Sequence, residues 1–203
     1  MKLKMNQPTK ILMSIIFVIG LIAFIPSTLS QIKTEDEITN PFALGTIDIE
    51  IEETFDPPEK WDGTTTEKKV QIHNVGSTEA LIRVALVPRW ENADGTPFAG
   101  DTQLIKLSVP ASTTPGWVDG GDGYYYYNAK VLSGNLTVPL LSAVTIEITD
   151  FAQNERYREK QVKIDVKAET VHALKEAYEA VWPQMAQSGS ATDTMLRTLI
   201  PNN

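Results

Sequence analysis

From residue 46 onward, short segments of alternating hydrophobic and polar residues are separated by turn residues. In residues 46–53, Ile47, Ile49 and Ile51 alternate with acidic residues. Successive strand side chains point to opposite faces, so this pattern predicts a strand with one core face and one acidic, solvated face. Further strands are predicted at residues 68–73, 80–87, 104–109, 124–129, 143–148 and 161–169. Seven short strands divided by turns rich in Gly, Pro, Asn and Asp predict an all-β fold, an antiparallel β-sandwich.

One short C-terminal helix is predicted at residues 171–182. The apolar residues at helical spacing are Val171, Leu174, Tyr178, Val181 and Trp182. Pro183 then prevents the helix from continuing. Residues 184–203 mix polar residues with a few apolar ones, and this composition predicts a flexible tail with at most one helical turn. The sandwich domain is therefore expected at residues 45–183.

Residues 1–30 have the layout of a secretory signal peptide. Three lysines precede an uncharged apolar run at residues 11–25, which Pro26 ends. The run is short for a membrane span of about 20 residues, so cleavage is favoured over a retained anchor. The small residues Thr28 and Ser30 are expected at the third-last and last positions before the cut, leaving Gln31 as the new N-terminus. Residues 31–44 then form an N-terminal segment ahead of the sandwich.

Net charge and cysteine content limit the partners that the chain is expected to bind and the interactions that can stabilise it. The chain has a net charge of −8, and removal of residues 1–30, which hold three lysines and no acidic residue, makes it −11. Such a surface repels nucleic acid and anionic lipid headgroups, so we expect no nucleic-acid partner and membrane contact only through the uncleaved signal. The chain contains no cysteine, so an exported form depends on its core for stability.

The sequence offers little for catalysis, and we expect no enzyme activity. It has two histidines, His73 and His172, in separate predicted elements, and no His-Glu-x-x-His string for a zinc peptidase. His172 with Glu176 and Glu179 on one helix face is interpreted as a solvated face. No thiol, Gly-x-Ser-x-Gly elbow or phosphate-binding glycine loop is found. No cofactor and no catalytic, cofactor-binding or metal-binding residue is therefore predicted.

Two further segments have alternative interpretations. Asp119 and Asp122 flank a glycine pair and could supply oxygen ligands to calcium, although the favoured interpretation is a hairpin turn. The aromatic residues Trp90, Trp117 and 124–127 could form a sugar-stacking platform. In a strand, Tyr124 and Tyr126 face opposite to Tyr125 and Tyr127, so half are expected in the core and half in an exposed strip.

Several ordered blocks resemble the BsaA-like branch of the TasA family. They are NPFALGTIDIEIEE (40–53), VQIHNVG (70–76), ALIRV (80–84), GWV (116–118), DGYYYY (122–127), IDVKAE (164–169) and AVW (180–182). The family comprises exported biofilm-matrix proteins of Gram-positive bacteria, released by a dedicated signal peptidase. The region at 28–30, the helix start at 171–172 and Pro183 depart from the family pattern.

The resemblance implies a jelly-roll-like sandwich that polymerises into extracellular fibres by donor-strand exchange. The freed N-terminal segment of one subunit completes the sheet of the next, with Gln31, Ile32, Ile38 and Phe42 as donor-segment residues. Independently, residues 31–40 are extended in character and carry Ile32 and Ile38 on one strand face. The implied partners are further copies of the chain, the signal peptidase during export and accessory matrix proteins.

Other function classes remain open on the residues alone. A secreted carbohydrate-binding or cell-surface adhesion module would use the Tyr/Trp strip as its binding face. A secreted hydrolase is disfavoured by the absence of a histidine pair. A sortase-linked pilin is disfavoured because the C-terminus, LIPNN, has neither a sorting pentapeptide nor a following apolar anchor. In each of these classes the expected location is outside the cell or at its surface.

Overall fold

The computed structural model describes residues 45–55, 65–148 and 151–200, and the side chains of residues 151–153 are not described. The chain divides into a unit of residues 1–43 and a unit of residues 44–203, and all the described residues lie in the second. The predicted cleavage residues Thr28 and Ser30 lie outside the described residues. So do the predicted donor-segment residues, which are Gln31, Ile32, Ile38 and Phe42.

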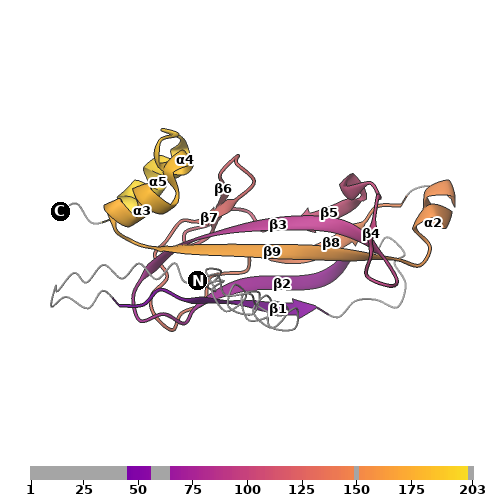
Figure 1. Cartoon of the computed structure of the whole chain (residues 1–203), viewed down its shortest axis with the longest axis horizontal. Helices are drawn as coiled ribbons and strands as arrows, with labels where there is room; N and C mark the ends of the chain where they lie inside the picture. Colours follow the sequence, from indigo (N-terminus) through magenta and orange to yellow (C-terminus); the bar gives the residue numbers. More distant parts are fainter. Residues whose placement is uncertain (1–44, 56–64, 149–150, 201–203) are drawn as a thin grey trace, which may run out of the picture. The chain divides into compact units, whose positions relative to one another are not determined.

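The described residues form two antiparallel sheets of a sandwich-like all-β fold, followed by short C-terminal helices (Figure 1). The first sheet has the order β1-β2-β8-β5. Its strands are β1 (Ile49–Phe55), β2 (Thr65–Asn74), β8 (Leu141–Ile146) and β5 (Ile105–Ser108). The two-residue alternation of the sequence is realised in β2, where Val70 and Ile72 are buried and their neighbours are not.

The second sheet is built around β3 (Ala80–Asn92). Along its whole length β3 pairs with β9 (Lys160–His172), in one unbroken antiparallel register from Ala80↔His172 to Asn92↔Lys160. Its other side pairs with two short strands, β4 and β7, and β7 pairs in turn with β6. These strands are β4 (Pro97–Phe98), β6 (Trp117–Asp119) and β7 (Tyr125–Tyr127). The remaining elements before β9 are the 3-10 helix η1 (Thr102–Leu104) and the helix α2 (Phe151–Tyr157).

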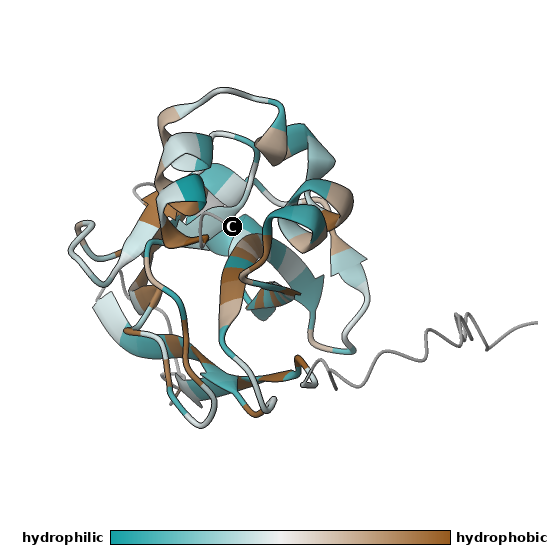
Figure 2. Cartoon of the chain, turned by 90° about the vertical axis from the view of Figure 1, so that its left-hand side faces the viewer, coloured by the Kyte–Doolittle hydropathy of each residue, from teal (hydrophilic) through white to brown (hydrophobic). Residues whose placement is uncertain are grey.

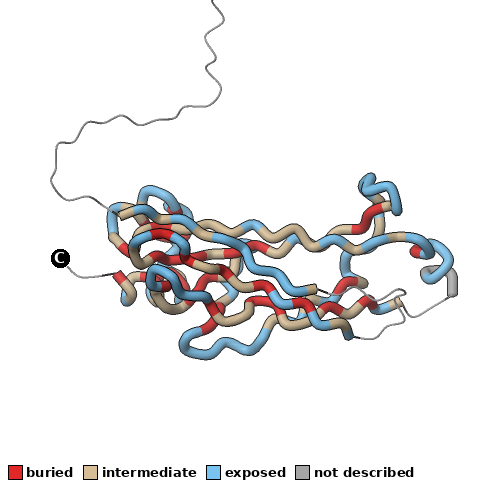
Figure 3. The backbone as a smooth tube through the Cα atoms, turned by 90° about the horizontal axis from the view of Figure 1, so that it is seen from below, coloured by how far each residue is buried: buried red, intermediate tan, exposed pale blue. Residues whose placement is uncertain are grey.

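The apolar faces of the two sheets pack against each other. Ile72 and Leu140 lie in one buried cluster with Ile82 and Val84 of β3. A second cluster brings Trp90 together with residues of the first sheet; its buried members are Val70, Trp90, Ile105, Leu141, Val144, Ile146 and Tyr157. Buried residues alternate with more exposed ones along β2, whereas β3 has runs of successive buried residues. Figure 3 shows the burial of each residue along the described chain. The packing of the two sheets confirms the sandwich that the sequence predicts, whereas the jelly-roll connectivity stays a prediction.

A helical cap covers the outer face of the second sheet at one end. It consists of α3 (Lys175–Val181), α4 (Pro183–Ala186) and α5 (Ala191–Leu199). Figure 1 shows these helices on one side of β3 and β9, with β1 and β2 on the other, and Figure 2 shows the same part of the chain turned by 90°. Leu81 of β3 and Tyr126 of β7 lie in one fully buried cluster with Trp182 and Leu196 of the helical region. The cap therefore adds a third layer over part of the sandwich.

The helical cap corrects the expectation of a flexible tail at residues 184–203. Pro183 does not end the helical region but occupies the first turn of α4, where a missing N–H costs nothing. Ser190 then caps α5, because its side chain accepts a hydrogen bond from the Asp193 N–H at 3.1 Å. The few apolar residues of this stretch, notably Leu196 and Ile200, are buried against the sheet. The predicted single helix at residues 171–182 is shorter, since β9 continues to His172.

Candidate assembly groove

A groove of about 480 Å³ runs between β1 at the edge of the first sheet and β9 at the edge of the second. Its apolar lining residues are Ile51, Phe55, Val144, Val162, Ile164 and Val166, and its polar lining residues are Glu53, Lys68, Lys163 and Asp165. The strand β1 contributes alternate residues, through the side chains of one face. The strand β9 contributes five successive residues, 162–166, so its backbone edge also lines the groove.

The floor of the groove is an apolar surface that the described chain leaves open. Ile51 is 41% exposed, although it belongs to the isoleucine row that the sequence predicts to be buried. The five central residues of β1 are all exposed, on both faces of the strand. The sequence pattern thus correctly identifies an apolar face, which the described residues cover only in part at Ile51. An apolar sheet face beside an open edge is a typical site for an added strand.

The free edge of β9 presents unpaired backbone groups to the groove. Ala80 exchanges two backbone hydrogen bonds with Val131, of 3.0 and 2.9 Å, on the side of β3 that faces away from β9. Backbone groups of successive strand residues point to opposite sides, so the even-numbered residues of β3 face away from β9. Their partners in the unbroken register include Val162, Ile164 and Val166. The N–H and C=O groups of these three residues therefore point away from β3, where no described strand is hydrogen-bonded to β9.

The edge of β1 has the same arrangement. In β2, the carbonyls of Val70 and Ile72 accept hydrogen bonds from Leu140 and Thr137, on the side away from β1. Their partners across the β1–β2 ladder are Glu53 and Ile51. The backbone groups of Glu53 and Ile51 consequently point to the free edge of β1. Both rims of the groove can therefore form a β-ladder with an incoming chain.

A charge pair interrupts the apolar floor. Lys68 points inward from β2, and its Nζ donates to Oε2 of Glu53 at 2.6 Å. The Nζ atom also lies 4.8 Å from the centroid of the Phe55 ring. The side chain of Lys68 is only 7% exposed, whereas that of Glu53 is 38% exposed. The sequence pattern does not predict this pair, although Lys68 stands at the inward position before Val70 and Ile72.

The exposed aromatic strip expected at residues 124–127 is mostly covered. Tyr126 is fully buried beneath the helical cap, Tyr127 is buried between the sheets, and Trp90 and Trp117 are buried as well. Tyr124 is partly exposed and stacks on Arg83, whose guanidinium carbon lies 4.1 Å from its ring centroid. These residues therefore do not form a flat, exposed sugar-stacking platform.

Beneath the helical cap, the buried tyrosines join a polar network. The Tyr126 hydroxyl donates to Asp122 at 2.7 Å and accepts from Arg83 at 3.1 Å. Burial and the Asp122 carboxylate together raise the pKa of Tyr126 to about 12. Burial opposes the ionisation of Glu169, but hydrogen bonds from Lys167, Arg83 and Tyr124 outweigh it and lower the pKa of Glu169 to about 2. The hydrogen bonds fix the 120–123 turn to the sheet, and the Arg83 guanidinium carbon also lies 5.0 Å from the ring centroid of Trp182 in the helical region.

The two aspartates considered as calcium ligands serve the turn between β6 and β7. Asp119 Oδ1 accepts from the Gly121 N–H at 2.8 Å, and Asp122 Oδ1 accepts from the Tyr124 N–H at 3.1 Å. Gly121 and Gly123 have φ angles of 72° and 90°, which glycine adopts without strain. The turn predicted for these residues is therefore present.

The histidines lie on different strands, His73 in β2 and His172 at the end of β9. His73 Nδ1 is 3.4 Å from Glu52, and His172 Nδ1 is 3.3 Å from the Thr78 hydroxyl. Within residues 45–55, 65–148 and 151–200, no group of three or more potential metal-ligating side chains is found. No helix in this part of the chain is long and apolar enough to cross a membrane.

The chain was compared with known proteins by sequence. A scan against protein-family models finds no match. A search of curated proteins finds no significant match either. Inference about function therefore depends on the geometry of the groove and on the sequence.

Proposed function

We propose that this protein is a structural subunit of an extracellular fibre. After export and cleavage behind Ser30, the N-terminal segment of one copy, residues 31–44, enters the groove between β1 and β9 of the next copy. The observation that carries the proposal is the open apolar groove between two free strand edges, with Ile51 left 41% exposed on its floor. The resemblance to fibre-forming matrix proteins and the signal-like residues 1–30 support the same function.

Burial of Ile32 and Ile38 and the hydrogen bonds of an added strand would stabilise a junction. The entropy lost when the donor segment becomes ordered would oppose it. A preformed groove such as the one observed keeps the cost to the donor segment alone. Before cleavage, the signal peptide would hold this segment at the membrane and prevent assembly inside the cell.

Electron microscopy of two chains tests the proposal. The chain that begins at Gln31 should form fibres, and the same chain without its first ten residues should remain monomeric. Replacement of Ile32 and Ile38 by Asp should likewise give folded monomers, because unpaired charges would enter the groove. A matched control replaces Lys33 and Thr39 by Asp, since these residues fall on the opposite face of a strand. Normal fibres from the Ile32→Asp/Ile38→Asp chain would exclude this segment as the donor.

A further inference from the structure

Lys68 is an unusual residue for the floor of an apolar groove. It occupies the inward row of β2 with Val70 and Ile72, and its side chain is 7% exposed. An ammonium group has three N–H donors, and Glu53 is the one acceptor for Lys68 among the described residues. Because Lys68 lines the open groove, solvent is the acceptor available to its remaining donors. Lysine is rarely buried without full pairing. A chain segment that covers the floor therefore needs a hydrogen-bond acceptor at this position.

A strand that occupies the groove changes the hydrogen bonding of Lys68. When a strand covers the floor, the water is expelled and the free N–H groups of Lys68 lose their acceptors. Leaving a charged donor buried and unpaired is strongly unfavourable, so a fitting occupant brings an acceptor to this point. A carboxylate is the strongest acceptor for an ammonium group. Because Glu53 is 38% exposed, it can turn toward solvent and leave room for a second carboxylate beside Lys68.

The proposed donor segment carries such a carboxylate at one position. Residues 31–40 read QIKTEDEITN. In a strand that directs Ile32 and Ile38 into the groove, Thr34 and Asp36 share that inward face. Asp36 is the only acidic residue on it, since Glu35 and Glu37 fall on the outward face. The apolar-acidic-apolar order of the segment thus matches the apolar-basic-apolar floor of the groove.

We infer that Asp36 of one copy pairs with Lys68 of the next and that this pair sets the register of the inserted strand. The inference rests on the proposed function, because it takes residues 31–40 as the occupant. A slip by one residue would turn both isoleucines outward. A slip by two residues would place Thr34 or Ile38 over Lys68 and leave its charge without a carboxylate from the donor. Lys68 is therefore a specificity-determining residue for the junction.

Site-directed cross-linking tests the register directly, because the chain contains no cysteine. One chain beginning at Gln31 carries Phe55→Cys, because Phe55 lies opposite Lys68 in the β1–β2 ladder and lines the groove. Its partner carries a single cysteine at position 34, 35, 37 or 38, so that Asp36 and Lys68 both stay in place. A short bismaleimide should join the inward positions 34 and 38, which flank Asp36, to position 55 at least tenfold more than it joins the outward positions 35 and 37, and this preference should be lost when the acceptor chain also carries Lys68→Met. An unchanged preference in the Lys68→Met chain would overturn the pairing but leave strand donation intact. No cross-link from any of the four positions would overturn both the pairing and the groove as the acceptor.

The charge interaction is tested by a double-mutant cycle on fibre elongation. Asp36→Asn and Lys68→Met should each slow elongation at least tenfold, and the double variant should be no slower than either one. Lys68→Arg keeps the positive charge and should retain most of the elongation rate. This variant distinguishes an effect of the charge from an effect of altered folding. The matched controls Glu35→Gln and Glu37→Gln remove the same charge from the outward face and should change the rate less than twofold. Additive effects, or an equal loss in the controls, would overturn the pairing.

Discussion

Arg83 on β3 and Glu169 on β9 stand opposite each other in the second sheet and are joined by two hydrogen bonds. The Nε and Nη2 atoms of Arg83 both donate to Oε2 of Glu169, at 2.9 and 2.5 Å. The same guanidinium carbon lies 4.1 Å from the ring centroid of Tyr124 and 5.0 Å from that of Trp182. One arginine thus ties the two long strands to the 120–123 turn and to the helical cap.

The first prediction is a pH-dependent contribution of Glu169 to stability. Its pKa is lowered from 4.5 to about 2 in the folded chain. Its stabilising effect is therefore fully present above pH 4.5 and is lost as the pH falls through about 2. Glu169→Gln should lower the free energy of unfolding by about 1–3 kcal/mol at pH 7 and by progressively less below pH 4.5.

Urea unfolding at several pH values between 2 and 7 measures this difference. Glu147→Gln is the matched control, because Glu147 is 55% exposed and lies 3.6 Å from Lys106 at the surface. The control should change the free energy of unfolding by less than about 0.5 kcal/mol. If Glu169→Gln lowers the free energy of unfolding by the same amount at every pH, the charge of the carboxylate does not contribute to stability.

The second prediction concerns the helical cap. Leu196 of α5 is fully buried in the cluster that contains Trp182 and Tyr126. Leu196→Ala should therefore lower the free energy of unfolding by about 2–5 kcal/mol, through lost burial and the cavity left behind. Val181 of α3 is 52% exposed, and Val181→Ala should cost less than about 0.5 kcal/mol. Chemical unfolding followed by tryptophan fluorescence measures the free energy of unfolding of both variants. An equal loss in the two variants would contradict the packing of α5.

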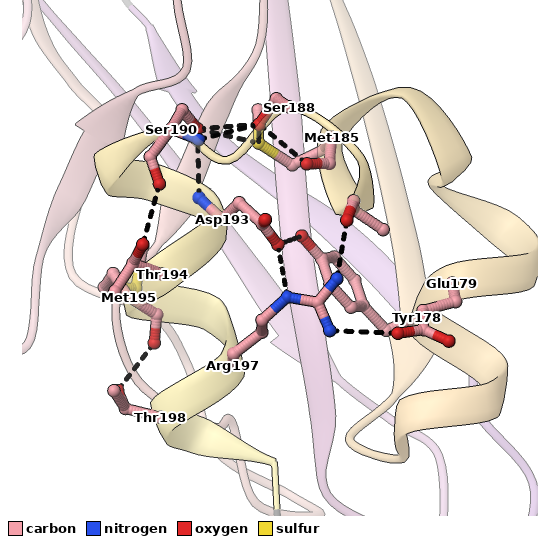
Figure 4. Close-up of polar contacts among 11 residues, drawn as sticks. Tyr178, Glu179, Met185, Ser188, Ser190, Asp193, Thr194, Met195, Arg197 and Thr198 are labelled. Atoms are coloured by element: carbon pink, nitrogen blue, oxygen red, sulfur yellow. Dashed lines mark hydrogen bonds and ion pairs between the residues drawn. The ribbon is translucent and has the colours of Figure 1, made fainter.

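A polar network supports the same cap (Figure 4). Arg197 donates from Nε to Asp193 and from Nη1 to Glu179, both at 2.9 Å, and the Tyr178 hydroxyl donates to Asp193 at 2.8 Å. Burial and the Asp193 carboxylate raise the pKa of Tyr178 above its ordinary value. Two of these contacts join α3 to α5 across 15 and 18 positions of sequence, and local sequence patterns do not reveal them.

The sandwich could be predicted from the sequence because its signal is local. All seven strands expected from alternation are present, although β3 extends to Asn92 and β9 to His172, where pairing between the two continues. The two-residue β4 and three-residue β6 were missed because strands of that length carry no period. The cap was missed for a different reason: α4 and α5 are too short to be stable alone and depend on burial against Leu81 and Tyr126.

The groove could be predicted only in part. The isoleucine row of β1 is visible in the sequence, but the pattern alone treats such a row as core. That Ile51 lies on an open floor follows from the placement of β1 and β9 at the edges of two different sheets, which are more than 100 residues apart in the chain. The role proposed for Lys68 follows from that placement and not from the sequence pattern.

The third prediction is the site of signal cleavage. Thr28 and Ser30 are small residues at the positions that a signal peptidase reads, so the exported chain should begin at Gln31. N-terminal sequencing of protein recovered from the medium measures this directly. Retention of the lysines at positions 2–10 would exclude a cleaved signal.

The fourth prediction is that added zinc produces no peptidase activity. His73 and His172 lie on different strands and hydrogen-bond to, or lie beside, different partners. A zinc peptidase needs two histidines that reach one metal ion. Casein incubated with the purified chain and excess zinc should therefore remain intact. Chelator-sensitive cleavage that disappears in His172→Ala would contradict the prediction.

The last prediction assigns the edge with which the inserted strand pairs. We expect β9, because it is braced by β3 over thirteen residues and lines the groove with five successive residues. The Ile164 N–H points away from β3, so Ile164→Pro removes a donor from the free edge while the β3–β9 ladder stays complete. This variant should fold and yet elongate fibres at least tenfold more slowly than Ile164→Ala, which controls for the lost side chain. Glu53→Pro blocks the β1 edge in the same way and should elongate as fast as Glu53→Ala, which controls for the lost carboxylate beside Lys68. Circular dichroism confirms folding, and light scattering follows elongation. Slow elongation in Glu53→Pro with a normal rate in Ile164→Pro would move the pairing edge to β1.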